Sequence, residues 1–114
     1  MDQELLIIQK TYDLILWYIP HVNKMPRNHR FGLGDRITTR LYHVLEELIR
    51  ARYAREKQSL LRNVNSEIEI LRFQTRLMRD FQVFSNKQYE YASAQIHEIG
   101  SMLGGWLRQQ EKKP

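Results

Sequence analysis

The chain has 114 residues and a formal net charge of +5, from 18 lysines and arginines against 13 acidic residues. Its length predicts a single domain over residues 1–114, and its content of 42% hydrophobic and 27% charged residues excludes an intrinsically disordered chain. Because the sequence has no cysteine, disulfides, thiolate nucleophiles and cysteine-ligated metal centres are excluded.

The first predicted element is a helix over residues 3–19, in which apolar side chains recur in steps of three and four. Its predicted inner face consists of Leu5, Ile8, Tyr12, Ile15 and Ile19. We expect Pro20 to end this helix, because proline lacks an amide donor and clashes with the preceding turn. The connection that follows, residues 20–30, is predicted to be the longest in the chain.

The same stretch is not predicted to enter a membrane. Gln9, Lys10 and Asp13 interrupt it, whereas a bilayer span needs about 20 mostly apolar residues. Asp2 and Glu4 stand where a signal peptide would carry basic residues. We therefore expect a cytoplasmic protein that has no membrane partner.

Three further helices are predicted over residues 32–56, 59–82 and 86–109. We expect a turn near Lys57, because an uninterrupted helix of about 50 residues, at about 1.5 Å per residue, is too long for so small a domain. Ser85 or Asn86 is expected to cap the last helix. Four amphipathic helices with short connections predict an all-α fold, an antiparallel four-helix bundle.

Residues 25–37, MPRNHRFGLGDRI, bring glycines and arginines together just before the second helix. They lack the Lys-Ser/Thr pair of a phosphate loop and the third glycine of a dinucleotide fingerprint, so a nucleotide site is not predicted. Two interpretations stay open. The glycines allow a close backbone approach at a turn, or the amides and Arg27, Arg30 and Arg36 bind a backbone phosphate.

Arginines also follow one side of the second and third helices. Arg36 and Arg40 are one turn apart on the second helix, and Arg72, Arg76 and Arg79 form a stripe on the third. Such stripes are either solvated flanks with ion pairs, contacts between subunits, or a surface for phosphates. The candidate nucleic-acid-binding residues are Arg27, Arg30, Arg36, Arg40, Arg72, Arg76 and Arg79.

The sequence predicts no catalytic residue, metal site or cofactor. No glutamate is followed three residues later by histidine, as a carboxylate-bridged di-metal bundle requires. The H-E-x-x-H and G-x-S-x-G signatures are also missing. Gly100, Gly104 and Gly105 lie within the last predicted helix, where each costs about 1 kcal/mol relative to alanine. We expect close packing against a neighbouring helix, within the bundle or between subunits, to explain them.

Three segments carry a resemblance to a known family. They are Leu16-Trp17, Pro26-Arg27-x-x-Arg30-Phe31-x-Leu33-Gly34-Asp35-Arg36-Ile37 and Ile99-Gly100-x-Met102-Leu103-Gly104-Gly105-Trp106. In order and spacing they resemble the accessory variability determinant (Avd) proteins of diversity-generating retroelements. More distantly, the chain is similar to the four-helix-bundle proteins encoded in ribosomal RNA intervening sequences. The Gly-Asp-Arg and Leu-Gly-Gly-Trp segments favour Avd.

The resemblance implies a four-helix bundle that assembles into a basic homopentamer. It implies binding to the retroelement's reverse transcriptase and to template-repeat RNA or complementary DNA, in support of mutagenic complementary DNA synthesis and retrohoming. It implies no catalytic residue in this chain. The alternative is a protein–protein adaptor of the intervening-sequence type, which has no direct role with nucleic acid.

Overall fold

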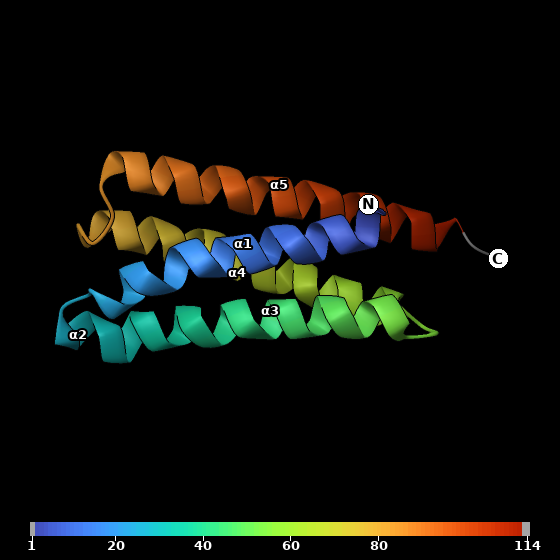
Figure 1. The fold of residues 1–114 in the computed structure, drawn as a ribbon, viewed down its shortest axis with the longest axis horizontal. Helices are drawn as coiled ribbons and strands as arrows, with labels where there is room; N and C mark the ends of the chain where they lie inside the picture. Colours follow the sequence, from blue (N-terminus) through green and yellow to red (C-terminus); the bar gives the residue numbers. More distant parts are fainter. Residues whose placement is uncertain (1, 113–114) are drawn as a thin grey trace.

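The computed structural model describes residues 2–112, and Figure 1 shows their fold. The elements are α1 (Gln3–Asn23), α2 (Arg27–His29), the π-helical turn η1 (Arg30–Gly34), α3 (Asp35–Tyr53), α4 (Gln58–Asp80) and α5 (Asn86–Glu111). Helix α1 packs against α3 and α5, and α4 packs against the same two helices. The predicted all-α antiparallel four-helix bundle is therefore confirmed, with α1 and α4 on one diagonal.

Helix α1 does not end before Pro20, and the predicted end at residue 19 is wrong. The helix continues to Asn23, because the residues on either side of the proline, Tyr18 and Val22, are buried in the core. Pro20 itself is exposed, so water can bind the carbonyl that loses its amide partner. The packing of Val22 thus outweighs the cost of the proline.

The predicted long connection is consequently short. Only residues 24–26 separate α1 from α2, and the second helical segment begins at Arg27 rather than at residue 32. The later boundaries differ from the predicted ones by no more than three residues. Ser85 is the N-cap of α5, as expected: its hydroxyl oxygen accepts from the amide of Gln88 at 3.1 Å, and the Gln88 side chain accepts from the Ser85 amide at 2.8 Å.

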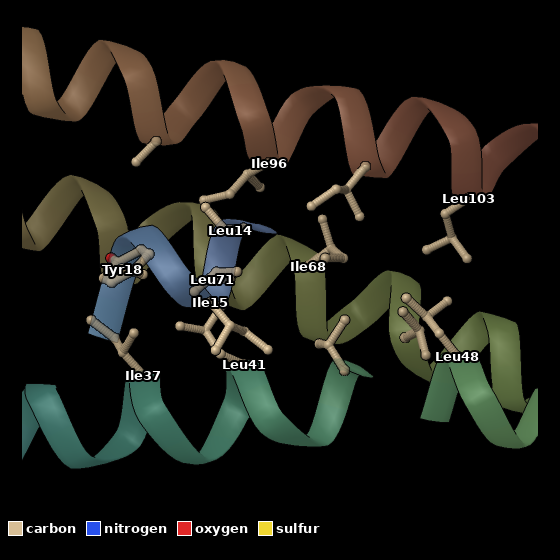
Figure 2. Packing of buried hydrophobic residues seen from close by; sticks show 14 of the residues in the cluster. Leu14, Ile15, Tyr18, Ile37, Leu41, Leu48, Ile68, Leu71, Ile96 and Leu103 are labelled. Atoms are coloured by element: carbon tan, nitrogen blue, oxygen red, sulfur yellow. The ribbon is translucent and has the colours of Figure 1, made fainter. Parts of the chain in front are cut away.

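The core runs along the whole bundle axis, as Figure 2 shows for its central layers. It includes Ile37, Leu41 and Leu48 of α3, Ile68 and Leu71 of α4, and Ile96 and Leu103 of α5. The predicted face of α1 is partly wrong. Ile7, Leu14 and Tyr18 are buried, whereas Leu5 and Tyr12 are exposed. This helix is apolar on two sides, so periodicity alone did not define its inner face.

One buried hydrogen bond joins the two diagonal helices. The Tyr18 hydroxyl lies 3.0 Å from the Thr75 hydroxyl, and both residues are fully buried. Burial raises the pKa of the Tyr18 phenol, which therefore stays neutral. Because each hydroxyl satisfies the other, the pair fixes the register of α1 against α4.

The two glycines of η1 are expected to respond differently to alanine. A Cβ at Gly34 would lie 3.1 Å from Val22 Cγ1 and 3.2 Å from Met25 Sδ, both buried, whereas a Cβ at Gly32 would meet nothing within 4 Å. We expect Gly34→Ala to be less stable than Gly32→Ala by about 1–3 kcal/mol, because the added methyl overpacks a closed site. Urea denaturation of both variants measures this difference, and equal stabilities would contradict it.

Candidate nucleic-acid interface

The first group of predicted arginines lies at one end of the bundle. Arg27 is on α2, Arg30 on η1 and Arg36 in the first turn of α3; we call these three residues the loop cluster. The ring of His29 stacks on that of Phe81, with centroids 4.7 Å apart, which joins α2 to the end of α4. Figure 1 shows α2 and the α4–α5 turn at this same end, which we call the α2 end.

The loop cluster is not neutralised within the described chain. Arg27 and Arg36 are exposed and Arg30 is half-buried. None of the three forms an ion pair with a carboxylate of residues 2–112. Three guanidiniums without carboxylate partners at one end of a rod 49 Å long produce a local positive field.

An exposed aromatic side chain stands among these arginines. Phe31 is 59% exposed, and the guanidinium carbons of Arg27 and Arg30 lie 5.6 and 5.2 Å from its ring centroid. These distances are typical of cation–π contacts. The sequence-based selection of site residues missed Phe31, although its position directly after Arg30 and four residues after Arg27, one helical turn, was a usable signal.

Arg40 differs from the loop cluster because it is paired with a carboxylate. It lines a groove of about 610 Å³ that runs beside α3. Its guanidinium pairs with Glu67 and donates to the Gln74 side-chain oxygen at 3.1 Å. Arg40 is thus part of a contact between α3 and α4, and a phosphate would have to compete with Glu67 for it. The groove is lined by Phe31, Gly32, Asp35, Arg36, Thr39, Arg40, His43 and Glu67.

The arginines of α4 share one edge of the helix, as predicted, but two of them are paired; we call Arg72, Arg76 and Arg79 the α4 stripe. Arg72 Nε lies 3.0 Å from a Glu69 carboxylate oxygen. Arg79 pairs with Asp80 at 3.0 Å, and its guanidinium carbon lies 4.5 Å from the Tyr89 ring centroid. Within residues 2–112, Arg76 has no such pair and is exposed.

The glycines of α5 have two different surroundings. A Cβ at Gly100 would lie 2.5 Å from Arg72 Nη2, so this glycine leaves room for the guanidinium on the α4–α5 seam. At Gly104 and Gly105 a Cβ would approach only the Arg108 side chain. The helix continues through both. Close packing inside the bundle therefore explains Gly100 and does not explain the following pair.

Two further features of the described residues concern metal binding and membrane insertion. No three His, Asp or Glu side chains among residues 2–112 gather as a metal site would require. None of the helices in this part of the chain is long and apolar enough to cross a bilayer. What the loop cluster provides is guanidinium donors, which bind phosphate or carboxylate oxygens.

Sequence comparison agrees with the resemblance described above. A family model described as bAvd-like matches residues 5–110, from the first turn of α1 to the last turn of α5, and thus includes the loop cluster. A comparison with curated proteins finds no match. Avd-like proteins are an accessory, non-catalytic kind of protein. Because the match covers nearly the entire chain, this protein belongs to the bAvd-like family.

Proposed function

We propose that this protein is a non-enzymatic accessory subunit of a diversity-generating retroelement. In this role it binds RNA or complementary DNA and the reverse transcriptase, and it supports mutagenic complementary DNA synthesis and retrohoming. The observation that supports nucleic-acid binding most strongly is the loop cluster, whose three arginines have no carboxylate partner within residues 2–112. The bAvd-like family membership supports the retroelement context.

Phosphate contacts would dominate this binding. Guanidiniums on mobile side chains hold phosphate oxygens but carry no sequence information by themselves. Each phosphate that they neutralise releases a condensed counterion, so affinity falls as salt rises. The α4 stripe would add phosphate contacts mainly through Arg76, because Arg72 and Arg79 already have carboxylate partners.

Fluorescence anisotropy with a labelled RNA tests the proposed binding to nucleic acid. We expect log K to fall with log salt with a slope of about −0.7 per phosphate contacted on a single strand. Three contacts from the loop cluster would then give a slope near −2 between about 50 and about 200 mM salt. A flat salt dependence, or no binding at the lowest salt, would contradict the proposal.

Helices α1 and α4 each expose apolar side chains that a protein partner would cover. On α1, Leu5, Tyr12 and Leu16 are exposed. An outer apolar stripe of α4, Ile70, Phe73 and Leu77, is also exposed and is continued by Phe81 just after the helix. These helices lie on opposite corners of the bundle. Two different apolar faces on one subunit suit head-to-tail contacts, which form a ring when the rotation between neighbouring subunits closes. They support the homopentamer that the family resemblance implies, with the remaining surface left for the reverse transcriptase.

A protein–protein adaptor is the second candidate, favoured by the ion pairs that occupy Arg40, Arg72 and Arg79. In this case the bundle would hold the polymerase without touching nucleic acid. Capture of the cognate reverse transcriptase from nuclease-treated lysate tests it. Retention of the polymerase, together with failure of the purified protein to bind RNA, would support the adaptor. Retention together with RNA binding would support the full proposal.

A further inference from the structure

We propose that Phe31, together with Arg27 and Arg30, forms a stacking site for an unpaired nucleobase. This inference rests on the proposed nucleic-acid binding and gives it a substrate class, single-stranded RNA or DNA. Its basis is the juxtaposition of an aromatic ring that is 59% exposed with two guanidiniums that lie within 6 Å of the ring centroid.

The position of Phe31 is not explained by the core. The buried aromatic residues, such as Tyr18 and Phe84, pack inside the bundle, whereas Phe31 extends from η1 into solvent. It also lines the groove that contains Arg36. An exposed phenyl ring in contact with two arginines of the loop cluster suits an external ligand that has both an apolar face and negative charge.

A nucleotide outside a duplex has this combination. Its base presents a flat π face, which stacks on aromatic rings or guanidinium planes, and its phosphate accepts hydrogen bonds from arginine. In a duplex the base faces are covered by their neighbours, so only the phosphates remain for the arginines. The Phe31 ring thus adds affinity for single strands and none for duplexes.

The chain contains a matched control at the other end of α3. Tyr53 is 80% exposed, and the Arg52 guanidinium carbon lies 5.9 Å from its ring centroid. Arg52 is neutralised by Asp2 at 3.0 Å and by Glu4 at 3.6 Å. Tyr53 is therefore also an exposed aromatic residue beside an arginine, but the arginine that contacts its ring is neutralised by carboxylates.

The test compares Phe31→Leu with Tyr53→Leu on a short unstructured RNA, the DNA of the same sequence, and a duplex of each. Base–aromatic stacking corresponds to roughly 5- to 150-fold in affinity. We expect Phe31→Leu to weaken binding to the single strands by this factor and to leave duplex binding within about twofold. Phe31→Tyr should restore the affinity because it keeps a π face. Tyr53→Leu should bind every probe as the unchanged protein does.

A second measurement identifies the base directly. Removing single bases from the bound strand should cost affinity with the unchanged protein and cost nothing further with Phe31→Leu, because the two losses share one contact. The relative effects on RNA and DNA distinguish a template strand from a complementary DNA strand as the source of the base. Circular dichroism checks that each variant remains helical.

The outcomes separate this inference from the proposed function. Equal loss of single-strand and duplex binding in Phe31→Leu would overturn the stacking site, as would unchanged single-strand binding. Unchanged RNA binding with lost capture of the reverse transcriptase would also overturn it and would make Phe31 a polymerase contact. If the unchanged protein binds no nucleic acid at any salt, the proposed function itself fails.

Discussion

Replacing Arg27, Arg30 and Arg36 together with glutamine should weaken binding to single-stranded RNA by about 100-fold at about 0.1 M salt. The estimate assumes one phosphate per arginine and about 0.7 log units per phosphate and per tenfold change of salt. Glutamine keeps the length and polarity of the side chain but removes the charge. None of these arginines has a carboxylate partner within residues 2–112, so the loss should appear in binding and leave folding stability nearly unchanged.

The matched control removes the same charge from the opposite end. Arg55, Arg62 and Arg108 form no ion pairs with residues 2–112 either, and they lie near the α3–α4 turn and the end of α5 (Figure 1). We expect their triple glutamine variant to weaken binding by less than about tenfold, through the loss of net charge alone. Equal losses of RNA affinity in the two triple variants would mean that binding depends on the total charge of the protein and not on the loop cluster.

The largest effect on stability is expected from Leu71→Ala. Leu71 is 0% exposed and lies at the centre of the core layers in Figure 2. Its truncation should lower the free energy of unfolding by about 2–5 kcal/mol, because it removes buried contacts and leaves a cavity. Urea denaturation at one fixed protein concentration measures the change, since assembly would make stability depend on concentration.

The adjacent residue provides the control. Ile70 is 43% exposed and belongs to the outer apolar stripe of α4, so Ile70→Ala should cost less than about 1 kcal/mol in the isolated bundle. If this stripe is a subunit contact, the same variant should instead shift the oligomer distribution in sedimentation. A loss of stability as large as that of Leu71→Ala would show that the inner face of α4 has been assigned wrongly.

Much of the bundle is predictable from the sequence because helical periodicity defines the inner face of three of its four long helices. On α3, α4 and α5 the periodicity identifies the buried side chains, such as Leu41, Ile68 and Ile96. On α1 the periodicity does not identify the buried side chains, because apolar residues cover two sides of the helix and nothing in the local sequence shows which side faces the core. The helix also continues past Pro20, because the burial of Val22 decides its length.

The candidate site is less predictable, because its charge pattern depends on contacts that are distant in sequence. Arg40 and Glu67 are 27 residues apart, so their pairing could not be read from helical spacing. The close approach of the Arg72 guanidinium to Gly100 likewise joins α4 to α5. The loop cluster differs, since its arginines lie within ten residues of one another. The local sequence therefore placed these three arginines together, and only the fold showed that they have no carboxylate partner within residues 2–112 whereas Arg40, Arg72 and Arg79 do.

Ultraviolet crosslinking of a single-stranded RNA to the protein, followed by mass spectrometry of the peptides, tests directly whether nucleic acid binds at the loop cluster. We expect crosslinks concentrated in residues 27–36, with Phe31 among the modified residues, and we expect their loss when Arg27, Arg30 and Arg36 are replaced with glutamine. Crosslinks confined to the opposite end, around residues 55–62 and 108, would contradict it.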